Sequence, residues 1–67
     1  MTIIFSTRAF EYEYGKRPRG RGWWAFSFKG QQFFYTGMYS EAKKACAEHI
    51  KSMSDELGDY VIVKVDT

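Results

Sequence analysis

Residues 23–36 read WWAFSFKGQQFFYT, and this stretch predicts the fold more directly than any other part of the chain. Large apolar residues fill both sides of Lys29-Gly30, and that pair suits a two-residue β-hairpin turn because glycine tolerates positive φ. The stretch therefore predicts two antiparallel strands, residues 23–28 and residues 31–36, joined by a tight turn.

This turn sets a register that separates the two faces of the hairpin. One face pairs Phe26 with Phe33 and Trp24 with Tyr35, and such facing rings predict the buried side of a sheet. The other face mixes Ser, Gln and Thr with Trp23 and one further aromatic residue. We expect that mixed face to be left for solvent or for a partner.

Residues 40–57 predict an amphipathic helix with Ser40 as its N-cap and Gly58 as its terminator. Its apolar stripe comprises Ala42, Ala45, Cys46, His49, Ile50, Met53 and Leu57. A helix with one such stripe covers one face of a sheet. Alternating valines in residues 60–65 then predict a last strand.

The residues before the hairpin predict a long first strand, residues 3–14. Its second half alternates aromatic and acidic side chains: Phe10, Glu11, Tyr12, Glu13 and Tyr14. Such a strand is unusually long, so a bulge or break is expected within residues 6–9. The two glutamates would lie on a solvated face or form ion pairs with nearby basic residues.

Together these elements predict one α+β domain over residues 1–67, in the order β-β-β-α-β. We expect a four-stranded, mainly antiparallel sheet with one helix packed across one face. The helical crossover favours one parallel pair, and the last strand could lie beside the first or the third. Because so short a chain is marginally stable alone, a homodimer is also an expectation.

Cys46 is the only cysteine, so no internal disulfide can form, as is typical of a reducing compartment. The first residues have no basic segment followed by a continuous apolar one, and no stretch approaches the ~20 apolar residues of a membrane span. The sequence thus predicts a cytoplasmic protein with no membrane partner.

A basic loop, defined as residues 15–22 (GKRPRGRG), is the main candidate for function. The net charge of the chain is only +2, but Lys16, Arg17, Arg19 and Arg21 concentrate positive charge in this short segment. Its glycines and proline exclude regular structure. It is not a Walker phosphate-binding loop, because no Lys-Ser/Thr pair follows the glycines and a strand comes next.

Trp23 follows the basic loop directly, and positive charge beside a stacking ring is typical of proteins that bind single-stranded nucleic acid. We therefore expect a small, basic, non-enzymatic module that contacts nucleic acid. A loop whose charges only keep the surface soluble is the simpler alternative. The expected contact residues are Lys16, Arg17, Arg19, Arg21, Trp23 and Phe34, extended by Lys43 and Lys44.

Residues 23–50 resemble the C-terminal half of double-stranded RNA-binding domains. The shared pattern is two strands, a Lys-Gly turn and the helix start SEAKKA at residues 40–45. The resemblance implies that Lys43 and Lys44 contact phosphates across a groove. The chain departs from that family because no first helix is predicted and a further strand follows the helix.

A second hypothesis is a protein–protein module. In size and character the chain looks like accessory proteins of phages and mobile elements, some of which inhibit host defence or nucleic-acid-processing proteins. The basic loop and Trp23 would then dock on an acidic protein surface.

Catalytic residues are not expected. Cys46 and His49 lie three residues apart on the apolar stripe, where a cysteine is usually packed and inert. One histidine and one cysteine are also too few to hold zinc. The sequence therefore predicts neither enzymatic activity nor a metal or cofactor.

Overall fold

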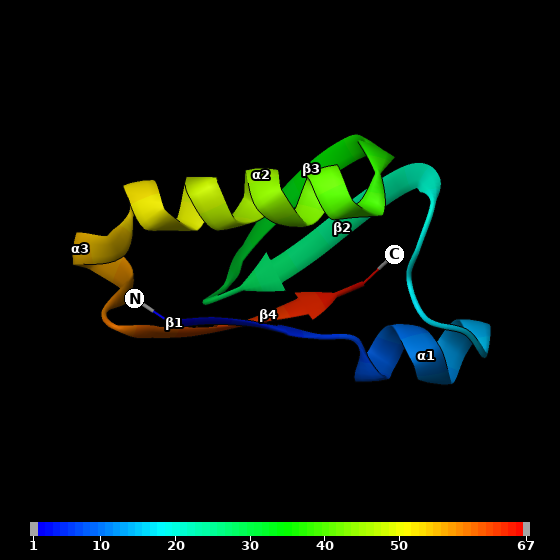
Figure 1. The fold of residues 1–67 in the computed structure, drawn as a ribbon. Helices are drawn as coiled ribbons and strands as arrows, with labels where there is room; N and C mark the ends of the chain where they lie inside the picture. The colour runs from blue at the N-terminus through cyan, green and yellow to red at the C-terminus, as the bar shows by residue number, and fades with distance from the viewer. Residues whose placement is uncertain (1, 67) are drawn as a thin grey trace.

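The computed structural model describes residues 2–66, which form a four-stranded mixed sheet and three helices (Figure 1). The strands lie in the order β1-β4-β2-β3 across the sheet. The α+β class and the strand number are confirmed. The predicted order β-β-β-α-β is only partly correct, because it lacks the helices α1 and α3. In chain order the elements are β1 (Thr2–Ser6), α1 (Arg8–Tyr14), β2 (Arg21–Phe28), β3 (Gln31–Met38), α2 (Tyr39–Ser52), α3 (Ser54–Leu57) and β4 (Tyr60–Val65).

The hairpin of β2 and β3 has the predicted register, including the Phe26–Phe33 pair. Lys29 and Gly30 both have positive φ, 47° and 75°, as a tight turn of this kind requires. The predicted core face of β2 is buried. Both strands extend two residues beyond the expected ends, so β2 already begins within the basic loop.

β4 lies inside the sheet, parallel to β1 on one side and antiparallel to β2 on the other. This places the last strand beside the first, one of the two positions that the sequence left open. The parallel pair is β1 with β4, and not β3 with β4, the two strands that the helical crossover joins. In the β1–β4 pair, Thr2 lies opposite Tyr60, and the pairing continues from there along both strands. The alternating valines of β4 are fully buried, as the pattern predicts.

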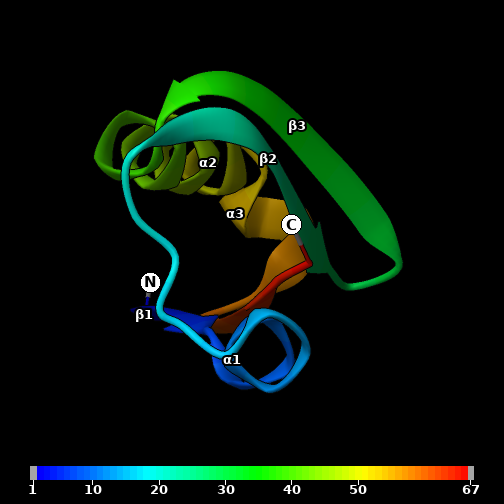
Figure 2. The same ribbon diagram turned by 90° about the vertical axis from the view of Figure 1, so that its right-hand side faces the viewer.

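α2 packs on the core face, and the sheet curves around it (Figure 2). Two expectations about its ends are wrong. Met38, not Ser40, occupies the N-cap position, in an extended conformation. The helix also breaks at Met53: the Ser52 hydroxyl donates to the His49 carbonyl at 2.6 Å, and the Met53 amide bonds instead to Ile50 at 3.0 Å.

Residues 8–14 form α1, so the long first strand is wrong. The chain leaves β1 at Ser6, within the segment where a break was expected. The Glu11 amide donates to the Thr7 carbonyl at 2.9 Å, and the Thr7 hydroxyl donates to the Glu11 carboxylate. Gly15 ends the helix in the left-handed region, with φ 68° and its amide 2.8 Å from the Glu11 carbonyl.

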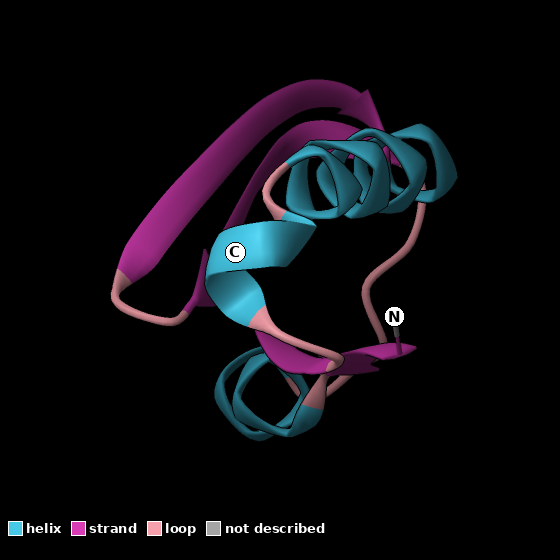
Figure 3. Cartoon of the chain, turned by 90° about the vertical axis from the view of Figure 1, so that its left-hand side faces the viewer, coloured by secondary structure: helices cyan, strands magenta, loops and turns pink. Residues whose placement is uncertain are grey.

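α1 lies on the opposite side of β1 and β4 from α2 (Figure 3). Phe10 is buried and reaches the end of the core, where its ring centroid is 5.8 Å from that of Trp24. The basic loop therefore connects a helix to a strand, not two strands of a hairpin. Among residues 2–66, no helix is both long enough and apolar enough to cross a bilayer.

Candidate nucleic-acid interface

The basic loop borders an open pocket of about 490 Å³, which we call the loop pocket. Its lining residues come from α1, from the basic loop and from the start of β2. Figure 2 shows the path of the loop between these two elements. The sequence-predicted residues Lys16, Arg17, Arg19, Arg21 and Trp23 all line it. The remaining lining residues are Phe10, Tyr14, Gly20, Gly22 and Trp24.

The backbone of the basic loop is fastened to the rest of the molecule. Gly15 and Gly20, with φ values of 68° and 81°, turn the chain at its two ends. The Gly20 carbonyl accepts a hydrogen bond of 2.8 Å from the Tyr39 amide at the start of α2. Pro18 is buried between these points. The loop thus presents its charges from a fixed path.

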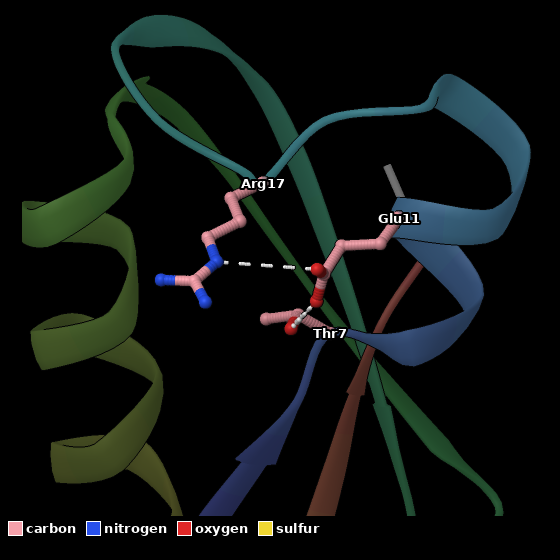
Figure 4. A network of polar contacts seen from close by, with 3 residues as sticks. All are labelled: Thr7, Glu11 and Arg17. Carbon is pink, nitrogen blue, oxygen red and sulfur yellow. Dashed lines mark hydrogen bonds and ion pairs between the residues drawn. The ribbon is translucent and has the colours of Figure 1, made fainter.

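One cation of the loop makes an ion pair. Nε of Arg17 lies 4.0 Å from Oε1 of Glu11, and the two side chains are 90% and 42% exposed (Figure 4). A pair so long and so exposed contributes little stability. Within residues 2–66, Lys16, Arg19 and Arg21 form no ion pair, so most of the loop charge faces water.

The aromatic wall of the loop pocket is held by packing and by one buried hydrogen bond. Nε1 of Trp24 donates to the Gly37 carbonyl at 3.0 Å, which fixes the indole against β3. Phe10 packs between Trp24 and Tyr14, with a centroid distance of 4.5 Å to Tyr14. Tyr14 is 46% exposed, so its ring is partly available at the pocket.

Trp23 and Phe34 stack on the outer face of the sheet, with centroids 5.4 Å apart and ring planes 15° apart. They are 55% and 52% exposed, and we call them the Trp23–Phe34 platform. Phe34 does not line the loop pocket, but Trp23 belongs to both surfaces. The platform therefore extends the site from the pocket onto the outer, mixed face of the β2–β3 hairpin, the face expected to be open to solvent or to a partner.

The two neighbouring lysines of α2, Lys43 and Lys44, have different surroundings. The Lys43 ammonium lies 5.3 Å from the Tyr39 ring centroid and 6.0 Å from that of Phe5, within cation–π range. Lys43 also lines a second hollow of about 270 Å³, together with Arg17. Lys44 is exposed and lines neither hollow. Only Lys43 therefore adjoins the loop.

The helix stripe offers little chemistry. Burial raises the pKa of the Cys46 thiol to about 12, so it is protonated at neutral pH. The His49 ring packs against Phe33 at the edge of the core, with centroids 5.2 Å apart. Within residues 2–66, no three His, Cys, Asp or Glu side chains group closely enough to hold a metal ion.

Sequence reasoning missed Phe10, Tyr14 and Trp24 as pocket residues. Trp24 was expected only in the core, and the first two were assigned to a strand. The spacing of Phe10 and Tyr14, four residues apart and followed by a glycine, is the signal that could have placed both on a short helix.

No protein-family model matches this chain, and no curated protein or solved structure matches it either. The resemblance of residues 23–50 to double-stranded RNA-binding domains gains no support from these comparisons.

Proposed function

We propose that this chain is a small, non-enzymatic module that binds nucleic acid through the loop pocket and its basic rim. The observation that carries the proposal is the arrangement of Lys16, Arg17, Arg19 and Arg21 around one aromatic-walled pocket, with a single weak ion pair between them and the rest of residues 2–66. Arginines so placed can each bind a phosphate through two hydrogen bonds.

The fixed path of the loop supports this function energetically. A flexible basic loop would lose conformational freedom on binding, and that loss subtracts from affinity. Here the Gly20–Tyr39 hydrogen bond and the buried Pro18 order the backbone beforehand. Four phosphate contacts would give a log–log salt slope of about −3 to −4 on duplex DNA.

The alternative is a protein partner with an acidic surface, as in an accessory protein that inhibits a host complex. The exposed Trp23–Phe34 platform favours this reading, because tryptophan and arginine dominate the binding energy of many protein interfaces. A stoichiometric protein partner that stays bound after nuclease treatment would favour this reading over direct nucleic-acid binding.

The test is a fluorescence-anisotropy titration with labelled single-stranded and duplex oligonucleotides at two salt concentrations. Replacing Arg17, Arg19 and Arg21 by Ala should weaken binding at least tenfold and flatten the salt slope by about 2 to 3, close to one unit per lost phosphate contact. The matched control replaces Lys29, Lys51 and Lys64, which are exposed and outside the loop, and so changes the net charge equally.

Binding that is absent even at low salt would exclude the proposed function. Equal losses in the two triple variants would show that only the net charge of the molecule matters, not the loop.

A further inference from the structure

The loop pocket has a feature that phosphate binding does not require. Exposed arginines on a convex surface would suffice to contact a nucleic-acid backbone, yet here they surround a hollow of about 490 Å³. Its interior side is aromatic, because Tyr14 is about half exposed there and packs on the buried Phe10, which in turn contacts Trp24. Trp23 also lines the hollow, but its ring stacks on Phe34 on the outer face of the sheet, at the edge of the pocket. A ligand part that is flat and apolar fits this interior.

We propose that the loop pocket receives one unpaired nucleobase, so that the protein prefers single-stranded nucleic acid to duplex. This inference rests on the proposed function and names its ligand class. A base is a flat ring system that stacks on aromatic side chains, and every base carries a phosphate on each side along the chain. The base would lie against the wall while the flanking phosphates meet the basic rim.

The size of the pocket agrees with this ligand. Sites that bind small molecules have volumes of about 300–1,000 Å³, and the loop pocket lies within that range. A base in a duplex must first be unpaired and unstacked before it can enter such a pocket, and this step costs free energy. A single strand does not carry that cost, so the pocket discriminates between the two forms.

The wall is also held in place by specific contacts. The Trp24 indole is held by its hydrogen bond to the Gly37 carbonyl, and Phe10 is packed between Trp24 and Tyr14. Trp23 leads out of the pocket onto the Trp23–Phe34 platform, whose two ring planes are nearly parallel. The neighbouring nucleotide would therefore find a second stacking surface.

The first experiment uses the unaltered protein. Its affinity for a short single-stranded oligonucleotide is compared with its affinity for the same sequence in a duplex, and for versions of the single strand in which successive bases are removed to leave abasic sites. We expect the single strand to bind best and removal of one particular base to weaken binding roughly 5- to 150-fold, the loss of one stacked base. Abasic strands keep every phosphate, so a loss reports the base alone.

The second experiment changes the wall. Tyr14→Ala and Trp23→Ala should weaken single-strand binding by a similar factor and duplex binding by much less, so that the preference for single strand falls while the salt slope of single-strand binding is kept. Tyr12→Ala is the matched control, because Tyr12 is 94% exposed on α1 and does not line the pocket. Circular dichroism of each variant shows whether it remains folded.

The two proposals fail in different ways. If neither oligonucleotide form binds at low salt, the proposed function is lost. If duplex binds as tightly as single strand, or if abasic strands bind like the intact one, nucleic-acid binding stands but the base-receiving pocket is overturned.

Discussion

Gly22 and Gly37 face each other across β2 and β3, but their backbones differ. Gly37 has φ +145°, a region that side-chain-bearing residues rarely adopt, and a β-carbon there would lie 3.0 Å from Cε1 of Tyr35. At Gly22 the nearest atom to a β-carbon would be Cζ2 of Trp24, at 4.0 Å. Because Gly37 also accepts the Trp24 hydrogen bond, its conformation supports the pocket wall.

Gly37→Ala should lower the free energy of unfolding by about 1–3 kcal/mol, the usual cost of a strained backbone. Gly22→Ala should change it by less than about 1 kcal/mol in either direction, since its backbone is ordinary and the space is open. Urea denaturation of both variants measures the difference. Equal effects would show that the conformation of Gly37 is not required.

Cys46 makes stability depend on alkaline pH. Burial raises the pKa of its thiol from the ordinary value of 9.0 to about 12, so between these pH values the folded chain holds a proton that the unfolded chain has lost. The free energy of unfolding should therefore fall as pH rises from about 9 to 12, by up to about 1.4 kcal/mol per pH unit. Below pH 9 this contribution is fully present.

Cys46→Ala is the comparison, measured by urea denaturation at several pH values. It should be less stable at neutral pH because it leaves a cavity, but its alkaline decline should be shallower. Burial also raises the pKa of Tyr39, and both proteins share that contribution. Parallel curves for the two proteins would contradict a role for the thiol.

At the scale of elements, α1 is the segment whose secondary structure differs from the prediction: it is a helix where a strand was expected. In a strand, Phe10, Tyr12 and Tyr14 would share one face, whereas in a helix Tyr12 points away from the other two. The exposed fractions of the three are 7%, 94% and 46%, and they follow the helix.

Phe10→Ala should cost roughly 3–5 kcal/mol of unfolding free energy, because it empties the end of the core beside Trp24. Tyr12→Ala should stay within about 0.5 kcal/mol. Thermal unfolding of the two variants measures the contrast. Similar losses at both positions would mean that the two side chains share a face, as in a strand.

The predictable elements had strong local signals. Lys29-Gly30 fixed the register of β2 and β3, and the helix stripe identified the buried residues Ala42, Cys46 and Ile50. The seven residues of α1 fit a two-residue period as well as a helical one, so their pattern did not decide between them. The helix begins with a contact between Thr7 and Glu11 and ends at the left-handed Gly15.

The residues of the candidate site were likewise predictable only in part. Charges can be read directly from a sequence, so the basic rim of the pocket was predicted residue by residue. Tyr14 and Phe10 reach the pocket only because α1 is a helix whose Phe10 contacts Trp24 of β2, and that packing is not a local property. For the same reason the divergence of Lys43 and Lys44 was not predicted.

At the scale of the whole molecule, the two sides of the sheet differ. One side encloses the core beneath α2, and the other exposes apolar side chains that include Ile4, Tyr60 and Ile62. Ile4 and Ile62 face each other across β1 and β4. A homodimer stays a prediction, and these side chains are where a second copy would find apolar area to cover.

The position of β4 between β1 and β2 determines the order in which the strands of the sheet can pair during synthesis. β1 is synthesised before β4, yet its hydrogen-bonding neighbour is residues 60–65, so β1 stays unpaired until all the segments between them have been made. The β2–β3 hairpin has its partners close by and can form early. The four-stranded sheet therefore cannot be completed until residues 60–65 are available to pair with β1 on one side and with β2 on the other.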